Sequence, residues 1–323
     1  MSSKGHIIVL SGFMALVLLL AGWREGRPDV PRPYHRPGEF RAAGDTIQGL
    51  PVQFGPYFVT SGRCAGCHGY DSLNTAMVDL DGHTVNVTDD WRSTMMANSA
   101  RDPFFRAKLE HEGLVNPAHA EALENSCLGC HAPQGAHQEH MLGHAPFTAA
   151  MLDGVGCLAC HMQNPDAAGT RFSGDLLFDS ARVYGPYPDS VINPAIMEFF
   201  VQFRPGQGAH ILDGRVCAGC HTLITKTVDL SGEPTGGIFV EQATWHEWLN
   251  SDYPALDINC RGCHLPRIDD PVILASEYLF LPAHSPFGKH HLVGGNTFML
   301  RMLRDNRELL QVPAQERHLD STI

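Results

Sequence analysis

The chain has 323 residues, a formal net charge of −12 and a hydrophobic residue content of 43%. A net charge this acidic disfavours binding to a phosphate backbone, so we expect no nucleic acid partner. The length permits one or two domains, and the 10 cysteines and 19 histidines are the residues whose roles need explanation.

The first 23 residues have the pattern of an export segment. Lys4 precedes an apolar run from Ile7 to Leu20, which has the length of a signal-peptide core and is short for a membrane span. Leu20 is bulky where signal cleavage prefers a small residue, so an uncleaved N-terminal anchor in the inner membrane is the alternative to a cleaved signal peptide. Trp23 stands where a lipoprotein would have its cysteine, which excludes lipidation. Both alternatives predict a periplasmic or extracellular location for the rest of the chain.

Residues 24–56 contain six prolines and five glycines. This composition prevents a long helix and predicts an extended tether. His35 in this tether and His318 in an expected mobile C-terminal tail are the histidines least expected to bind a metal.

Residues 57–323 form the remaining domain, and they contain five copies of the pattern Cys-x-x-Cys-His that together use all ten cysteines. In this pattern the two thiols bond covalently to haem and the histidine is the proximal iron ligand. Zinc ribbons also use Cys-x-x-Cys, but in pairs that complete four ligands, and five is an odd number. We therefore predict five covalently attached haem c groups, three on residues 57–165 and two on residues 209–311. The motifs are Cys64, Cys67 and His68; Cys127, Cys130 and His131; Cys157, Cys160 and His161; Cys217, Cys220 and His221; and Cys260, Cys263 and His264.

Helix start signals recur between the motifs. An Asp or Asn caps the free N–H groups of a helix, and a proline directly after it fits the first turn. The pairs with this pattern are Asp102-Pro103, Asn116-Pro117 and Asn193-Pro194. Asp90 is expected to cap another helix over residues 91–96. The helix from Asn193 should end near Phe203, before Pro205.

Other elements are expected after the second motif. The sequence Asp-Gly-x-x-Cys leads into the third motif from Asp153 and into the fourth from Asp213, which predicts the same turn at both places. Residues 165–190 are rich in glycine, aspartate and proline and form the longest expected loop. Residues 241–250 are expected to be helical, and residues 297–310 to form an amphipathic helix after a Gly-Gly-Asn cap. The expected fold is mainly α with extensive loops, wrapped around five haems.

Several short sequences resemble those of multihaem c-type cytochromes of the cytochrome c-554-like superfamily. They are Trp91-x-x-x-Met95-Met96-Ala97 with Asp102-Pro103, Cys127-x-x-Cys130-His131-Ala132-Pro133, Asp153-Gly154-x-x-Cys157, Glu241-Gln242 with Glu247-Trp248 and Ser251, and His290-His291-Leu292-Val293-Gly294-Gly295-Asn296. The resemblance implies an exported cytochrome with closely packed haems, many ligated by two histidines. The wider group contains electron carriers and enzymes of nitrogen compounds. Its pentahaem nitrite reductases have lysine in place of one motif histidine, whereas all five motifs here end in histidine.

The second axial ligands decide the chemistry, because an iron with two protein ligands carries electrons and an open iron can bind substrate. His290 is the first candidate, since the Gly-Gly turn after it permits a close approach to haem, and His291 is the alternative. A short helix expected after Pro133 aligns three further histidines on one face. The candidates are His290, His137, His140, His144, His210, His246, His119 and His284. Met95 or Met96 can ligate one iron instead, although these residues also fit core packing.

Three functions remain open at this point. The first hypothesis is an electron carrier that relays electrons between redox partner proteins through largely bis-histidine haems, without a catalytic residue. The second is an oxidoreductase with one open haem that acts on a small nitrogen or sulfur compound. The third is a subunit of a homo-oligomer or extracellular cytochrome polymer.

Overall fold

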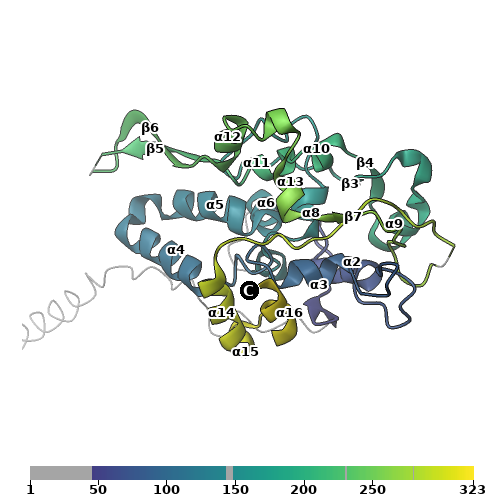
Figure 1. Cartoon of the computed structure of the whole chain (residues 1–323). Helices are drawn as coiled ribbons and strands as arrows, with labels where there is room; N and C mark the ends of the chain where they lie inside the picture. The colour runs from purple at the N-terminus through teal and green to yellow at the C-terminus, as the bar shows by residue number, and fades with distance from the viewer. Residues whose placement is uncertain (1–45, 143–147, 230, 279) are drawn as a thin grey trace, which may run out of the picture. The chain divides into compact units, whose positions relative to one another are not determined.

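The computed structural model describes residues 46–142, 148–229, 231–278 and 280–323. The predictions for the export segment, for most of the tether and for His144 lie outside the described residues. In the described part, short helices and long loops alternate with pairs of short strands (Figure 1). This mixture of helix and strand corrects the expectation of a mainly α fold.

Helices carry or border each attachment motif. Up to the third motif they are α2 (Ser61–His68), α3 (Val87–Arg92), α4 (Pro103–Val115), η1 (Pro117–His119), α5 (Ala120–His131), α6 (Pro133–Leu142), α7 (Ala149–Leu152) and α8 (Cys157–His161). The later helices are η2 (Asp189–Val191), α9 (Pro194–Val201), α10 (Ala209–Leu212), α11 (Arg215–Ala218), α12 (Thr244–Leu249), η3 (Pro254–Leu256), α13 (Cys260–His264), α14 (Thr297–Asp305), α15 (Arg307–Leu310) and α16 (Glu316–Thr322).

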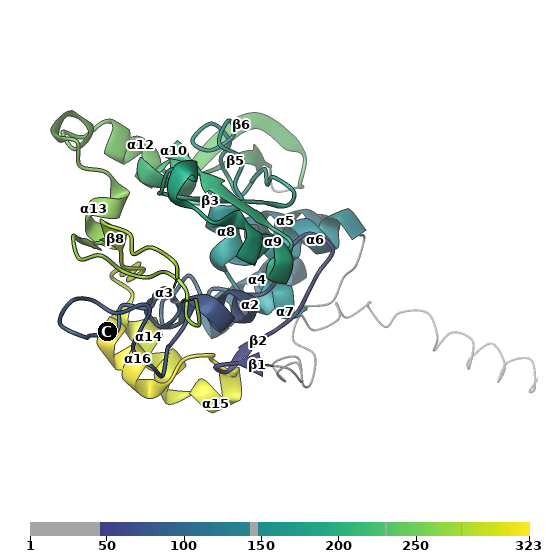
Figure 2. The same cartoon turned by 90° about the vertical axis from the view of Figure 1, so that its right-hand side faces the viewer.

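The strands form two-stranded sheets throughout the described ranges. The antiparallel pairs are β1 (Thr46–Ile47) with β2 (Leu50–Pro51), β5 (Leu223–Val228) with β6 (Pro234–Gln242), and β7 (Arg267–Ile268) with β8 (Phe287–Gly288). β3 (Arg182–Gly185) and β4 (Arg204–Gln207) pair in parallel next to α9 (Figure 2). As predicted, α9 ends before Pro205. Pro205 itself belongs to β4, a strand that no alternating hydrophobic pattern in the sequence predicted.

Three predicted helix starts are confirmed. Asp102 Oδ1 accepts a hydrogen bond from the Phe104 N–H at 2.8 Å at the start of α4. Asn193 caps α9 through the Ala195 N–H at 3.2 Å, and Asn296 caps α14. At Asn116, the third Asx-Pro pair, the chain starts a single 3-10 turn without a side-chain cap, and α5 follows it.

The predicted helix after Asp90 is wrong in both bounds. Asn86 caps α3 by accepting from the Asp89 N–H at 2.7 Å, and the helix ends at Arg92. The Asn98 side-chain amide then donates to the carbonyls of Arg92 and Thr94 at 3.0 and 2.9 Å. Because these carbonyls bond to a side chain, they are not available to extend the helix.

Three further predictions near the C-terminus need correction. The helix expected over residues 241–250 starts only at Thr244, because β6 extends to Gln242. The helix expected over residues 297–310 is divided at Asn306 into α14 and α15. His318 does not lie in a loose tail, since it belongs to α16 and to the capping box at the start of that helix.

The apolar interior is divided into separate clusters. One cluster joins α14, α15 and α16 around the fully buried side chains of Leu303 and Leu319, and Met95 packs against it. A second cluster packs Phe58 and Leu158 together near the first and third motifs. Such division suits a chain in which cofactors fill space between protein segments.

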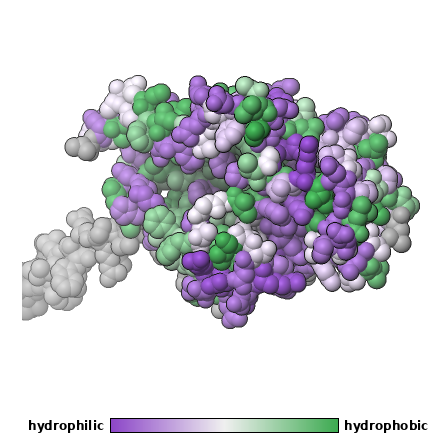
Figure 3. Space-filling model, viewed as in Figure 1, coloured by the Kyte–Doolittle hydropathy of each residue, from purple (hydrophilic) through white to green (hydrophobic). Residues whose placement is uncertain are grey.

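Two properties concern membrane spans and the surface. No helix within the described ranges combines the length and hydropathy that a bilayer span requires. On the face seen in Figure 3, hydrophobic residues follow the β5–β6 hairpin, where Ile238, Phe239 and Val240 are exposed.

Candidate haem-binding site

All five motifs adopt helical turns. α8 and α13 coincide with the third and fifth motifs, α2 and α5 end at His68 and His131, and α11 begins two residues before Cys217. Residues i and i+3 of a helix share one face. The fold therefore brings the two thiols of each motif to one side, with the histidine directly after them.

Backbone carbonyls orient three of the proximal imidazoles through Nδ1. The pairs are His68 with the Leu274 oxygen at 2.7 Å, His161 with the Tyr184 oxygen at 2.6 Å, and His264 with the Val293 oxygen at 2.8 Å. An Nδ1–H that donates to a carbonyl leaves Nε2 with its lone pair, and this tautomer binds metals.

Burial favours the neutral form of four proximal rings. It is the largest cause that lowers the pKa of the following imidazoles: His68, His131, His161 and His221. Metals bind the neutral form of histidine. The charge state of these side chains at neutral pH therefore suits iron.

Two buried imidazoles have unsatisfied nitrogens within the described part of the chain. His210 is fully buried, and neither of its ring nitrogens has a well-formed hydrogen bond. His131 stacks on Phe105 at a centroid distance of 3.8 Å, and its buried Nδ1 has no well-formed hydrogen bond. A buried polar nitrogen without a partner costs about 1–3 kcal/mol. Ligation of iron by Nε2 would satisfy one nitrogen of His210, so these residues fit haem c.

The first and third motifs are in direct contact. Asp153 Oδ2 accepts hydrogen bonds from the backbone N–H and the hydroxyl of Ser61, at 2.9 and 2.7 Å, at the start of α2. The same hydroxyl lies 3.3 Å from the Cys157 nitrogen and 3.4 Å from its Sγ. The Cys157 and Cys64 side chains are also neighbours, since each shifts the pKa of the other. A buried carboxylate thus joins the two motifs.

The fourth motif contacts three others. Gln163 Nε2 donates to the Ala159 oxygen at 2.9 Å and to the Val216 oxygen at 3.0 Å, which connects α8 with α11. Neighbouring cysteines make the remaining connections, because Cys220 and Cys130 shift each other's pKa, as do Cys217 and Cys260. All five motifs consequently form one connected set, with the fourth at its branch point.

The predicted similarity of the turns before the third and fourth motifs is confirmed. Gly154 has φ +62° and Gly214 has φ +82°, a region that glycine adopts without steric cost. The turn at Gly154 also contacts the segment after α3. Val155 N–H donates to the Met96 oxygen at 2.9 Å, and Trp91 Nε1 donates to the Val155 oxygen at 2.9 Å.

Among the candidates for second ligands, His290 lies next to a proximal histidine. Its ring centroid is 6.2 Å from that of His161, with 20° between the ring planes. The neighbouring His291 has a side chain that is 41% exposed, and its Nε2 lies 3.8 Å from Asp90 Oδ2.

Three other candidates lie against aromatic rings. His137 is 5.1 Å from Phe178, His246 is 5.0 Å from Phe172, and His284 is 4.5 Å from Tyr187. His119 is exposed, with Nε2 directed at Gly232 in the β5–β6 turn. The structure describes the backbone of His140 but not its side chain. Met95 lies in the core of the C-terminal helices, which fits packing.

Sequence reasoning missed the residues that join the motifs. In the sequence, Asp153 is recognisable only as part of a repeated turn, because its partner Ser61 is 92 residues away. Gln163 follows the third motif by two residues and carries no recognisable signal. Within the described ranges, no group of three or more metal-ligating side chains forms a separate metal site, whereas a haem iron takes at most two ligands from protein.

Comparisons with known proteins agree with the motifs. The family model described as cytochrome c554 and c-prime matches residues 63–162, which include the first three motifs. No curated protein gives a significant match. A penta-heme cytochrome c552 from Thermochromatium tepidum is similar at 19% sequence identity and a TM-score of 0.41. That match covers 75% of this chain and 59% of the other, so the chain spans less than two thirds of the length of that cytochrome.

Over residues 63–162 the chain resembles the cytochrome c554 family, and this similarity together with the motifs supports a multihaem c-type cytochrome with covalently bound haem c.

Proposed function

We propose that this chain is an exported pentahaem cytochrome that relays electrons between redox partner proteins. The observation that carries the proposal is the contact between the attachment motifs. The first motif contacts the third, the third contacts the fourth, and the fourth contacts the second and fifth. Because a motif holds its porphyrin against its own two thiols, contacting motifs hold neighbouring cofactors.

The residues around the motifs suit electron transfer without substrate binding. Haem c supplies one-electron exchange between ferric and ferrous iron when bound. The motif histidines would hold the irons, and non-motif histidines such as His210 and His290 are available as second ligands. The backbone contacts of His68, His161 and His264 would limit reorganisation when an electron arrives or leaves.

Export and partner choice belong to the same proposal. The apolar run from Ile7 to Leu20 directs the chain out of the cytoplasm, and the net charge of −12 favours basic redox partners. Replacing residues 7–20 with a cytoplasmic start should give colourless or unstable chain. Cytoplasmic protein with a full haem complement would contradict the export.

A haem count tests the first part of the proposal. After denaturation and acid extraction, intact mass should retain five covalently bound haems, because ten thioether bonds survive this treatment. A reductive titration of the native protein should take up five electrons. A mass or an electron count equivalent to four or fewer would contradict the pentahaem assignment.

A pair of motif deletions tests the branch point. In the variant Cys217→Ser/Cys220→Ser the motif that contacts three others is removed, whereas Cys260→Ser/Cys263→Ser removes a motif with one known thiol contact. Each variant should retain four haems by mass. The first should lose much more of the exciton coupling between haems in Soret circular dichroism. Equal losses in the two variants would contradict a relay that branches at the fourth motif.

A further inference from the structure

His161 and His290 come from distant parts of the chain. His161 is the last residue of α8, and His290 lies in the segment between β8 and α14. A metal–imidazole bond is about 2 Å long and the ring centroid lies about 1 Å behind the bonding nitrogen, so two imidazoles on opposite sides of one iron have centroids about 6 Å apart. The observed centroid distance of 6.2 Å agrees with this value.

The hydrogen bonds of both rings leave the same nitrogen available. Nδ1 of His161 lies 2.6 Å from the Tyr184 oxygen, and Nδ1 of His290 lies 3.0 Å from the Gly288 oxygen. In the part of the chain that the structure describes, neither Nε2 has a hydrogen-bond partner. Each ring thus has the tautomer of an iron ligand.

Asp90 selects His290 over its neighbour. Asp90 Oδ2 accepts a hydrogen bond from the His290 backbone N–H at 3.0 Å. The same oxygen lies 3.8 Å from Nε2 of His291, whose side chain is directed towards the surface. The Asp90 carboxylate therefore fixes the backbone of His290 and lies near the ring of His291.

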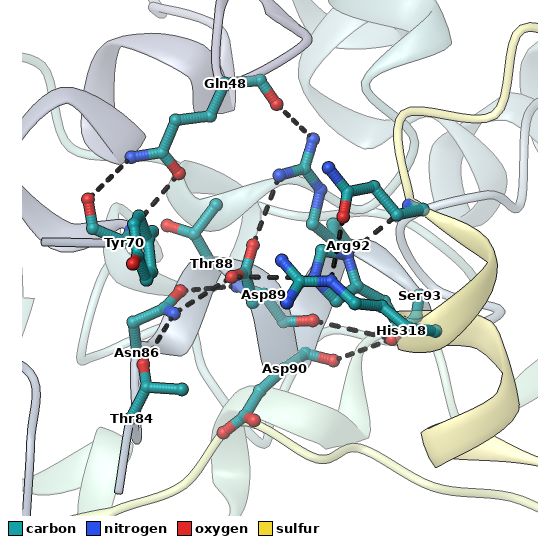
Figure 4. A network of polar contacts seen from close by, with 12 residues as sticks. Gln48, Tyr70, Thr84, Asn86, Thr88, Asp89, Asp90, Arg92, Ser93 and His318 are labelled. Atoms are coloured by element: carbon teal, nitrogen blue, oxygen red, sulfur yellow. Dashed lines mark hydrogen bonds and ion pairs between the residues drawn. The ribbon is translucent and has the colours of Figure 1, made fainter. Parts of the chain in front are cut away.

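The helix that carries Asp90 is itself fixed by polar contacts, shown in Figure 4. Asn86 caps α3 through the Asp89 N–H at 2.7 Å. Arg92 lies 3.2 Å from Asp89 Oδ1 and donates to the Gln48 oxygen at 2.5 Å. His318 Nε2 lies 3.6 Å from Asp89 Oδ2. These contacts connect α3 with the N-terminal strands and with α16, which makes it a stable support for the His290 segment.

We propose that His161 and His290 are the two axial ligands of the iron at the third motif, and that Asp90 is the positioning residue for His290. This inference rests on the proposed function, because it assigns one of the closed irons of the relay. An iron held by both imidazoles would be low-spin and would supply electron exchange without substrate binding.

The first experiment uses the full-length holoprotein with His290→Ala, and His291→Ala as the matched control. His290→Ala should keep all five haems by mass and convert one low-spin iron in five to a high-spin iron, and added imidazole should restore the low-spin spectrum. His291→Ala should leave the spectrum unchanged. His290→Met should keep the iron low-spin and raise the potential of one haem, since thioether ligation raises it.

A deletion background identifies which iron is affected. In Cys157→Ser/Cys160→Ser, which lacks the third haem, adding His290→Ala should cause no further spin change. In Cys127→Ser/Cys130→Ser, which lacks the second haem, it should still produce one high-spin iron. A high-spin iron produced by His290→Ala in the absence of the third haem would show that His290 closes another iron and would overturn the pairing with His161.

The role of Asp90 is tested by rescue. Asp90→Ala should give a mixture of low-spin and high-spin iron at one haem, whereas Asp90→Asn should restore the low-spin state because its amide oxygen still accepts the His290 N–H. Unchanged spectra in both Asp90→Ala and His290→Ala would overturn the inference. These outcomes leave the relay itself intact, because the relay is tested separately, by the haem count and by the search for an open iron in the unmodified protein.

Discussion

Substitution of Asp153 by asparagine tests how the first and third motifs are joined. The Asp153 side chain is almost fully buried, and it accepts two hydrogen bonds from Ser61. Burial raises its pKa from the ordinary 3.8 to about 6, although the hydrogen bonds and the nearby Arg101 act in the opposite direction. Asp153→Asn keeps the size and an acceptor oxygen but removes the ionisable group.

The sign and size of the effect follow from proton linkage. The folded state binds the proton of Asp153 more tightly than the unfolded state, so the stability gained at low pH is lost as pH rises towards and through about 6. The full difference of 2.2 pH units corresponds to about 3 kcal/mol. Between pH 5 and pH 7.5, the free energy of unfolding should fall by about 1.4 kcal/mol from this group alone.

The assay is guanidinium denaturation of the holoprotein, followed by far-UV circular dichroism at several pH values. The difference in unfolding free energy, wild type minus Asp153→Asn, should decrease by about 1.4 kcal/mol from pH 5 to pH 7.5. Asp213→Asn is the matched control, because Asp213 occupies the same turn before the fourth motif but its side chain is 45% exposed. It should change the unfolding free energy by no more than about 0.5 kcal/mol at either pH. A wild-type minus Asp153→Asn difference that does not vary with pH, or that increases, would refute the reasoning.

Two further predictions concern the frame around the motifs. Gly154→Ala should lower the unfolding free energy by about 1–2 kcal/mol because alanine is strained at the left-handed φ of this residue. Overpacking should lower it by about 1–3 kcal/mol more, since the added Cβ would lie 2.7 Å from the Ala97 oxygen. Gly82→Ala, at φ +80° in open space, should show only the first effect, and equal losses would contradict the assigned contact. Leu303→Ala should cost about 2–5 kcal/mol because Leu303 is fully buried among α14–α16. Leu309→Ala, at a residue that is 75% exposed, should cost less than about 0.5 kcal/mol, and a similar loss at both leucines would contradict the packing of these helices.

Local signals in the sequence predicted local structure well. The Cys-x-x-Cys-His pattern identified all five helical attachment turns, and Asp102, Asn193 and Asn296 were recognised as caps because capping depends on neighbouring residues only. Asp90 was mistaken for a cap because Asn86, four residues earlier, carries the same signal. A sequence alone does not reveal which of two such residues is used, and here the bond from Asn98 to the Arg92 carbonyl ends the helix early.

Contacts between distant residues could not be predicted in the same way. β3 and β4 pair in parallel through residues that include Pro205 and Gly206, which resemble a loop. The partner of Asp153 is set by how α2 meets the third motif. The neighbour of His161 was likewise hidden, because His290 is 129 positions further along the chain and no local pattern links the two residues.

Carbon monoxide binding to the reduced native protein tests the central claim most directly. An imidazole in the sixth position must leave before carbon monoxide can bind iron, so a relay built from histidine-closed irons should show almost no spectral change after reduction and addition of the gas. The same sample should have accepted five electrons. If about one haem in five binds carbon monoxide in undamaged protein, one iron is open, and an oxidoreductase acting on a small nitrogen or sulfur compound becomes the better account.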